Sequence, residues 1–457
     1  MAIINNALSG ALAAQVALSA SSQNIANLQT KGYTRQAALL TTIGPGADPR
    51  AAGNGVQVTS LLRFSDGYKS QAMWRAAADL GAHSQTQPYL TQLESVMGDS
   101  TASLSAGIDD FFGALNAVGG DPGPTPLREQ VLNAAGLMAE RFNGLNNVFN
   151  AQLQSVRTQR SAIVDAANAQ IATIARLNAQ IGNANASGQN ASAMIDARDQ
   201  AIDDLAGKMA VEISDNGDGT RNVSLKTGQA LVLGGIYGTL KAAPTATSAQ
   251  EFSLTFANTT YVLDAAKLGG QLGGLTKYET ETLVPLQQDI ADIARQIADK
   301  VNTQLGAGFK TDGTAGTPLF VYTPGSGPDM LKVTSGFVAA DLAFSSDGTP
   351  GDTGNLQKLS LLKTQPITVG SIGVVLLGDA DTQLVGKLGV ASQLNKAALK
   401  TTQTVRTQSV DDWQSTSGVN QDEEAVNLVE YQNMYQANMK VISIANQLFD
   451  ATLAMMG

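Results

Sequence analysis

The feature that most constrains the fold is a long segment without proline. It follows a cluster of three prolines at residues 121–126, and no further proline occurs before Pro244. The cluster should end one helix and start the next at Pro126 or Leu127. Inside the segment, one seam advances in alternating steps of three and four: Leu153, Val156, Arg160, Ile163, Ala167, Gln170, Ile174, Leu177 and Ile181. Such a helix without internal caps is typical of a coiled coil or a rod, and the polar seam members indicate a narrow, Ala-rich contact.

Both ends of the chain repeat this pattern on a smaller scale. The N-terminal seam consists of Ile4, Leu8, Ala11, Gln15, Leu18, Ser22 and Ile25. The C-terminal seam consists of Leu428, Tyr431, Tyr435, Asn438, Ile442, Ala445 and Phe449. Three acids at residues 422–424 precede the C-terminal seam, where the helix dipole favours negative charge. We therefore expect a helix at each end, and we expect the two helices to meet.

The middle of the chain carries a different signal. Residues 208–269 contain short alternating runs separated by turn residues, which is typical of β-strands. Residues 278–305 return to helical spacing, residues 306–355 are rich in Gly, Thr, Asp and Pro, and residues 379–410 are again helical. Residues 41–55 hold six glycines and prolines and are predicted to form a loop.

These segments predict an α+β fold that is mostly α. We expect an elongated, multidomain rod of long helices, with terminal coiled-coil helices and an inserted β domain. Three domains are expected, and each is built from separated pieces of the chain. The terminal coiled-coil assembly domain takes residues 1–60 and 411–457. The long-helix rod domain takes residues 61–207, 270–305 and 352–410, and one outer β domain takes residues 208–269 and 306–351.

Composition excludes several functional classes. The chain has 29 Lys and Arg against 39 Asp and Glu, so its net charge of −10 disfavours a nucleic-acid binder. It has no cysteine, which excludes disulfides, iron–sulfur clusters and thiolate zinc sites. His83 is the single histidine, so no histidine cluster can hold a metal, and we expect this residue to lie on the surface. We expect no cofactor and no bound metal.

The sequence also predicts no membrane insertion. No uninterrupted apolar run approaches the ~18 residues that a membrane span needs. The first basic residue is Lys31, so the N-terminal segment lacks the positive start of a signal peptide. We expect a protein that stays in the cytoplasm or leaves the cell by a route that does not read such a signal.

No catalytic motif stands out. Adjacent carboxylates point ~100° apart on a helix, which suits solvated faces better than an acid/base pair. Residues 215–220 faintly resemble a calcium loop, but Gly217 and Gly219 occupy two of the ligand positions, so a hairpin turn is favoured. Neither a phosphate-binding loop nor a nucleophile elbow is present. The chain is therefore not expected to be an enzyme.

Two stretches carry a family resemblance. Residues 21–36 resemble the N-terminal motif of bacterial flagellar axial proteins, with matches at Asn24, Ile25, Asn27, Gly32, Tyr33, Thr34 and Arg35. Residues 417–438 are similar to the C-terminal motif of the same proteins, with matches that include Asn427, Leu428, Gln432 and Tyr435. The pairing resembles the hook-associated protein 1 family in particular. Residues 196–199 and 272–275 also look like the middle region of that family.

The resemblance implies a function. It implies a structural subunit of the flagellum that self-associates into a ring between hook and filament. The implied partners are hook subunits, the next hook-associated protein on the filament side, and an export chaperone on the C-terminal helix. The implied location is extracellular, after a cytoplasmic stage before type III export, with terminal helices that order on assembly. Candidate assembly and partner-binding residues are Ile4, Leu8, Leu18, Ile25, Asn27, Tyr33, Arg35, Leu428, Tyr431, Tyr435, Ile442 and Phe449.

Three alternatives stay open at this point. The nearest is another flagellar axial protein, a hook or rod subunit. Long Ala-rich helices and the Gly-Tyr-Thr-Arg-Gln motif at residues 32–36 favour the junction protein over it. The second is an axial scaffold that carries a glycan hydrolase in its β insertion, although no credible acid/base set is present there. The third is a surface adhesin at the exposed tip.

Overall fold

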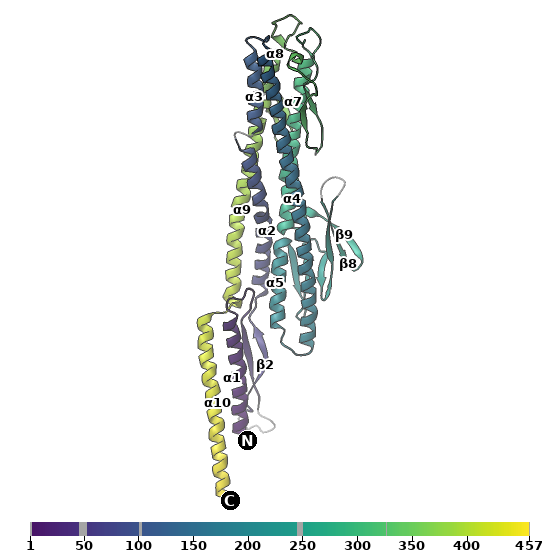
Figure 1. Ribbon diagram of the computed structural model, residues 1–457. Helices are drawn as coiled ribbons and strands as arrows, with labels where there is room; N and C mark the ends of the chain where they lie inside the picture. Colours follow the sequence, from purple (N-terminus) through teal and green to yellow (C-terminus); the bar gives the residue numbers. More distant parts are fainter. Residues whose placement is uncertain (1, 45–52, 100–102, 245–249, 326, 457) are drawn as a thin grey trace.

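The molecule is a long helical rod with a smaller unit at one end (Figure 1). The computed structural model describes residues 2–44, 53–99, 103–244, 250–325 and 327–456. Both chain ends lie in the smaller unit, which consists of α1 (Ala2–Ala26), α10 (Gln421–Met456) and the hairpin of β1 (Gln36–Thr42) and β2 (Val56–Arg63). We call this part the terminal unit. The predicted terminal helices are confirmed, and they lie side by side.

The face that α1 buries is made of small side chains. Ala7, Ala11, Ala13, Ala14, Ala17 and Ala20 are all buried, together with Ser21 and Asn24. The larger residues of the predicted seam are only half-buried or exposed, and Leu8 is 47% exposed. Alanine lets a neighbouring backbone approach closely and costs little side-chain entropy. The terminal unit is therefore held by a thin layer of alanines, and the large apolar side chains of α1 are left partly uncovered.

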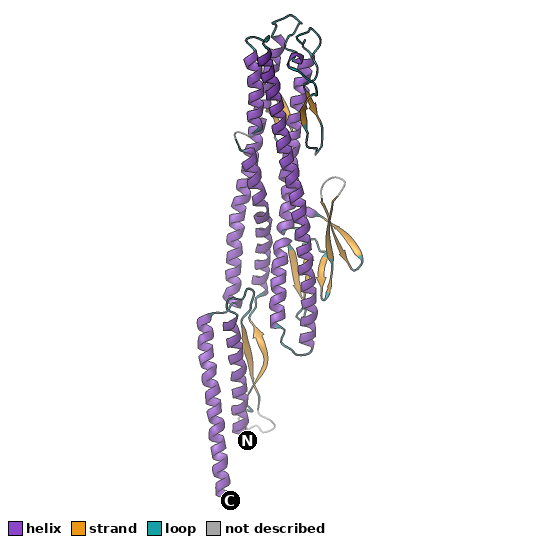
Figure 2. Ribbon diagram, in the orientation of Figure 1, coloured by secondary structure: helices purple, strands orange, loops and turns teal. Residues whose placement is uncertain are grey.

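The rod is a bundle of long helices (Figure 2). Its members are α2 (Gly67–Met97), α3 (Leu104–Val118), α4 (Thr125–Ala186), α5 (Ser192–Lys208), α6 (Gly270–Tyr278), α7 (Val284–Gly306) and α9 (Ala380–Ser417). Asp66 caps α2 by accepting hydrogen bonds from the backbone amides of Tyr68 and Lys69. A π-helical turn, Glu279–Leu283, joins α6 to α7. The predicted α+β fold with mostly helix is confirmed.

The long proline-free segment forms α4 as predicted. The helix begins at Thr125, with Pro126 in its first turn, and it buries nearly the whole predicted seam. One seam position differs, because Ile171 is buried whereas the neighbouring Gln170 is only half-buried. Arg160 stays in the seam and is 1% exposed, since it pairs with the buried Glu279. The seam of α4 is thus continuous, with one ion pair enclosed in it.

Glycines allow α2 to cross α6 at very short range. A Cβ atom on Gly274 of α6 would lie 2.2 Å from the carbonyl oxygen of Ala82. A Cβ atom on Gly81 of α2 would lie 3.3 Å from the backbone nitrogen of Gln271 in α6 and 2.1 Å from the carbonyl oxygen of Gly207 in the neighbouring α5. The neighbouring Gly273 is different, because its Cβ atom would meet nothing closer than 3.6 Å. Only one glycine of the pair in the 272–275 motif is therefore required by packing.

We expect Gly274→Ala to destabilise the rod by about 1–3 kcal/mol, because a backbone oxygen must move away from the added methyl group. Gly273→Ala is the matched control. It should be neutral or stabilise the helix by up to about 1 kcal/mol, since alanine is the better helix former. Urea denaturation followed by circular dichroism measures both. Equal effects of the two substitutions would contradict the close-crossing explanation.

Within the described residues, the strands form five small antiparallel sheets. Next to the middle of the rod lie β3 (Val211–Asp215), β4 (Arg221–Leu225), β5 (Ala230–Leu233) and β6 (Ile236–Tyr237) in one sheet. A second sheet of β7 (Thr239–Pro244), β8 (Gln250–Phe256) and β9 (Thr259–Leu263) projects from the same region (Figure 1). The other two-stranded sheets are β10 (Phe320–Tyr322) with β11 (Leu331–Val333) and β12 (Pro366–Val369) with β13 (Gly373–Leu376). The short helix α8 (Gly354–Ser360) lies at the far end of the rod, beside α3.

Two sequence-based expectations need correction. Residues 208–269 and 306–351 were expected to build one outer β domain, but their strands belong to separate sheets, and the second range lies farther along the rod against α4 and α7. The expected loop 41–55 begins two residues too early, because Thr41 and Thr42 are the last residues of β1 and pair with β2. Residues 45–52 of that loop lie outside the described part of the chain. The remaining division into a terminal and a rod domain stays a prediction.

The predicted hairpin turn at residues 215–220 is confirmed. Residues 215–220 form the turn of the β3–β4 hairpin, where Thr220 donates to Asp218 Oδ1 through its amide, at 2.9 Å, and its hydroxyl, at 2.6 Å. No group of three or more potential metal-binding side chains occurs within the described ranges. His83 is half-buried rather than fully on the surface, because its ring nitrogen Nδ1 lies 2.8 Å from Asn395 Oδ1.

One segment has the length and composition of a membrane span, which differs from the sequence-based expectation. It covers residues 3–26 and therefore coincides with α1. The alanine face of α1 packs against α10 and the β1–β2 hairpin. Packing within the terminal unit thus buries 33% of this apolar window.

Candidate assembly surface

The terminal unit exposes many large apolar side chains. On α1, Ile3 is 63% exposed and Leu12 is 55% exposed. On α10, the large apolar residues with the most exposure are Val426, Val429, Ile444, Leu448, Phe449, Leu453 and Met455. Val426, Val429 and Met434 line one open groove along α10. Exposed apolar patches of this kind mark protein interaction sites in soluble proteins.

Two contacts fix how α10 lies on α1. Gly10 faces Asn438 so closely that a Cβ atom on Gly10 would lie 2.6 Å from Asn438 Oδ1. At the other end of the pair, Ser21 donates a buried hydrogen bond to Glu424 Oε2 at 2.6 Å. The two helices are therefore antiparallel. In this register the residues of α10 after about 447 have no partner on α1, and Figure 1 shows α10 extending beyond the N-terminus.

The predicted assembly residues fall into two groups. Half-buried within the terminal unit are Ile4, Leu18, Ile25, Asn27, Tyr33, Arg35, Leu428, Tyr431 and Ile442. Exposed are Leu8, Tyr435 and Phe449, of which Phe449 lies in the overhang of α10 at 62% exposure. The role of all twelve in contacts with other proteins stays a prediction. The sequence did not single out Val426, Val429, Leu448 or Leu453, which lie off the seam and whose exposure depends on how α10 is placed.

The terminal unit is anchored to the rod by an ion-pair cluster. Arg63, the last residue of β2, pairs with Asp196 at 2.7 Å and with Asp199 at 3.1 Å on α5. Asp196 Oδ2 also accepts the backbone amide of Thr34 at 3.1 Å. Asp199 accepts from Arg198 at 2.9 Å and from Arg221 of β4 at 2.7 Å. Burial raises the pKa of the Asp196 carboxyl, against the opposing effect of Arg63.

This cluster explains the motif at residues 196–199. Its two carboxylates, both on α5, bind arginines from two other segments of the chain, the β1–β2 hairpin and β4. Sequence reasoning identified the motif only through the family resemblance. The signal that could have found it is the pair of acids three residues apart on one helix face, but its arginine partners could not be named without the fold.

The end of α1 is fastened to β1 through Asn24. The side chain of Asn24 is buried and bridges to Gln36, with its amide donating to the Gln36 carbonyl at 2.8 Å and its carbonyl accepting from the Gln36 amide at 3.0 Å. Tyr33 donates its hydroxyl to the same Asn24 carbonyl at 2.9 Å. Burial, with the nearby charges of Asp196 and Glu424, raises the pKa of Tyr33 to about 12. The hydrogen bonds around Asn24 therefore include the neutral side chain of Tyr33.

We expect the terminal unit to lose stability as the pH rises from about 10 to 12. An unfolded chain ionises its tyrosines near pH 10, whereas the folded state keeps Tyr33 neutral until about pH 12. Stability from this residue is thus complete below pH 10 and is lost as the pH rises through the folded pKa. Amide hydrogen exchange of α1 at several pH values measures the effect. Tyr33→Phe should reduce it, and Tyr68→Phe, at an 88% exposed residue of α2, should not; a response unchanged by Tyr33→Phe would contradict this assignment.

These features define a class of protein: an elongated helical subunit that presents its paired chain ends for assembly. Comparisons with known proteins agree with this class. The family model of the "Flagellar hook-associated protein FlgK helical domain" matches residues 90–320, and that of the "Flagellar basal body rod FlgEFG protein C-terminal" matches residues 413–455. The chain therefore belongs to the FlgK family of flagellar hook-associated proteins, and it is a structural component of the flagellum.

Full-length relatives support this placement. The flagellar hook-associated protein 1 of Escherichia coli strain K12 is 26% identical, with 99% of each chain covered. The protein of the same name from Salmonella typhimurium strain LT2 is 27% identical over 99% of each chain. That from Bacillus subtilis strain 168 is 23% identical over 97% of this chain and 96% of its own.

A solved structure shares the fold. It is the flagellar hook junction protein FlgK from Burkholderia pseudomallei, with a TM-score of 0.64 at 16% sequence identity. The match covers 76% of this chain and 100% of that one.

Proposed function

We propose that this protein forms the junction ring between the flagellar hook and the filament, and that it assembles through its paired terminal helices. The names of its relatives support the location, since they are hook-associated proteins 1 and a hook junction protein. The observation that carries the mechanism is the uncovered apolar surface of the terminal unit, above all on α10. When identical subunits repeat the same contact with a fixed rotation and rise, they build a ring or a tube.

The exposed apolar side chains of the terminal unit favour burial against other subunits. A fully buried Leu, Ile, Val or Phe contributes about 1.5–3 kcal/mol relative to an exposed one. The terminal unit offers Leu12, Val426, Leu448, Phe449 and Leu453, each more than half exposed. Burying such side chains between copies stabilises the assembled state and leaves the separate subunit with two thinly packed helices. Coupling order to assembly in this way also opposes premature association in the cytoplasm.

The proposed partners follow from the ends of such a ring. Hook subunits lie below it, the next hook-associated protein lies above it on the filament side, and neighbouring copies lie beside it. Before export, a chaperone covers α10, whose exposed apolar side chains would otherwise bind non-specifically. The final location is extracellular, at the hook–filament junction. The role is structural and not enzymatic, in keeping with the family.

Electron microscopy of cells that carry a gold-labelled copy tests the location. We expect label only at the boundary between hook and filament. Label along the whole hook or within the flagellar rod would instead support a hook subunit or a flagellar rod subunit. The match to a flagellar rod protein at residues 413–455 suggests that alternative. An untagged strain processed in parallel controls for background label.

A further inference from the structure

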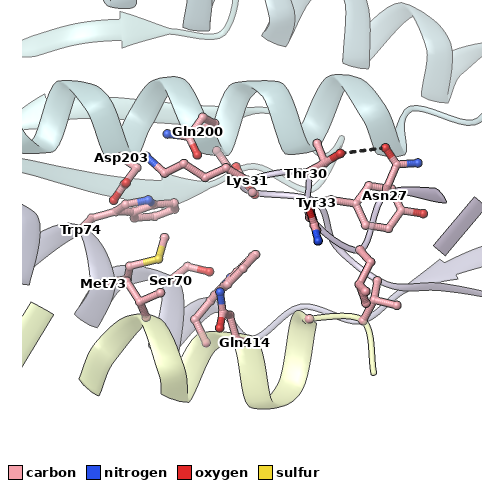
Figure 3. A pocket seen from close by; sticks show the side chains of 18 of the residues that line it. Asn27, Thr30, Lys31, Tyr33, Ser70, Met73, Trp74, Gln200, Asp203 and Gln414 are labelled. Carbon is pink, nitrogen blue, oxygen red and sulfur yellow. Dashed lines mark hydrogen bonds between the residues drawn. The ribbon is translucent and has the colours of Figure 1, made fainter. Parts of the chain in front are cut away.

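A cavity separates the terminal unit from the rod. Its volume is about 400 Å³, and its walls come from residues 27–33 of the terminal unit, from α2, α5 and α9 of the rod, and from the connection at residues 418–419. Figure 3 shows this cavity from close by. Both tryptophans of the chain, Trp74 and Trp413, lie in its walls. The cavity therefore lies at the joint between the two parts of the molecule.

The joint itself is narrow. The chain crosses it twice, after Arg63 and after Ser417. The helices of the terminal unit contact mainly each other and the β1–β2 hairpin, and no extensive helix–helix packing with the rod occurs among the described residues. The ion pairs of Arg63 with Asp196 and Asp199 hold one side of the joint, where a Cβ atom on Gly32 would lie 3.0 Å from Gln200 Oε1. The backbone amide of Arg35 also donates to the carbonyl of Ser417 at the end of α9, at 2.8 Å, and the remaining side of the joint is the open cavity.

Two buried polar atoms in the wall of the cavity lack a hydrogen-bond partner among the described residues. Asp203 is only 6% exposed, and its Oδ2 atom pairs with Arg406 at 2.6 Å. Its Oδ1 atom is buried and has no partner within the described residues. The indole nitrogen of Trp74 is likewise buried without a partner there. Asp199 differs, because both of its oxygens are occupied by arginines.

A cation from the terminal unit is directed at this wall. Lys31 lies in the loop after α1, is exposed, and makes no ion pair in the described structure. Figure 3 shows its side chain extending from that loop towards Asp203 and Trp74. A buried carboxylate oxygen without a partner is costly, and an ammonium group that reaches it would satisfy it and expel water from the cavity. The opposite charges thus lie across the space that a pivot would close.

We propose that Lys31 and Asp203 form a latch that sets the angle between the terminal unit and the rod. In the present structure the latch is open. In the second orientation the terminal unit swings into the cavity, and the Lys31 ammonium group donates to Asp203 Oδ1. The pivot stays at Arg63 and the Asp196–Asp199 cluster. The terminal unit therefore has two preferred orientations, rather than one fixed or many unrestricted ones.

Distance measurements between two spin labels test the latch. Because the chain has no cysteine, the substitutions Ser19→Cys on α1 and Gln403→Cys on α9 place labels at two exposed positions only. Pulsed electron–electron double resonance on the full chain should give two distances between the labels. Raising the salt concentration from 0.1 to 1 M should reduce the closed population, since salt screens a partly exposed pair.

Single substitutions at Lys31 decide the outcome. Lys31→Met removes the charge and keeps the length, and it should reduce the ratio of closed to open molecules by about fivefold. Lys31→Arg should preserve the closed population. Lys226→Met, at an exposed lysine in the turn after β4, is the control and should change nothing. A distance distribution that is the same for native protein and Lys31→Met, whether it is narrow, double or broad, overturns the proposal.

Discussion

Deleting residues 440–457 should abolish incorporation of the protein into the flagellum while the rod remains folded. The deletion removes the part of α10 that contains Ile444, Leu448, Phe449, Leu453 and Met455, all largely exposed. At about 1.5–3 kcal/mol for each apolar side chain that assembly buries, the loss should weaken subunit binding by more than about a hundredfold. The rod should melt as before, because the deleted segment lies in the terminal unit and contacts α1 rather than the rod helices.

The measurement separates export from assembly. In cells that lack the native gene copy, the amount of variant in purified hook–filament structures is compared with the amounts in the cytoplasm and in the medium. Variant in the medium but not in the structures indicates loss of assembly, and variant retained in the cytoplasm indicates loss of the proposed chaperone or export contact. The truncated protein found at the hook tip at native levels would count decisively against assembly through α10.

A matched pair of substitutions controls for general loss of apolar surface. Leu448→Gln with Phe449→Gln replaces two side chains of the overhang and keeps the helix length. Val390→Gln with Leu394→Gln makes the same change on α9, where these side chains are 61% and 67% exposed. We expect the first pair to reduce incorporation strongly and the second pair to leave it near the native level.

Arg160→Met should be among the most destabilising single substitutions in the rod. Arg160 of α4 pairs with Glu279 at the π-helical turn, and both side chains are almost fully buried, at 1% and 4% exposure. Burial lowers the pKa of Arg160, against the opposing effect of Glu279. Removing the cation leaves a buried carboxylate whose remaining cation, Arg157, lies 3.7 Å away. Breaking a buried pair in this way costs about 3–5 kcal/mol.

The double variant distinguishes the pair from simple loss of packing. Arg160→Met with Glu279→Met removes both charges and should recover most of the lost stability, since paired apolar replacements are often neutral or stabilising. Arg176→Met, at an exposed arginine on the same helix, is the control and should change stability by less than about 0.5 kcal/mol. Urea denaturation with hydrogen exchange across α4 and α7 measures all three. A double variant as unstable as Arg160→Met would mean that the charges do not carry the effect.

The long helices could be predicted because their signal is local. Spacing of three and four residues fixes which side of α4 is apolar, and the prolines at residues 121–126 fix where the helix begins. The same reasoning found the terminal helices and the β3–β4 turn. It failed for residues 36–42, because a hairpin with half-exposed strands has a weak alternating pattern. It also failed for the outer β pieces, since pairing between distant strands leaves no periodic trace in the sequence.

The candidate site was only partly predictable. Residues such as Leu428 and Tyr431 were found because they continue a seam, and they are half-buried in the terminal unit. Val426 and Leu453, which are each more than half exposed, escaped because they lie beside that seam. The family resemblance marked Tyr33 and the 196–199 motif without giving a physical reason for either.

The sequence alone determined the fold class, the positions of the long helices and the family, because periodic spacing and short motifs are properties of neighbouring residues. Only the tertiary structure decided which faces remain uncovered. Alanines bury the α1–α10 contact and leave larger side chains outside, which depends on how closely two helices approach. The tertiary structure also decided which charges meet. Arg63 is 133 residues from Asp196 in the chain and Arg221 is 22 residues from Asp199, and Coulomb interactions depend on distance in space rather than along the sequence.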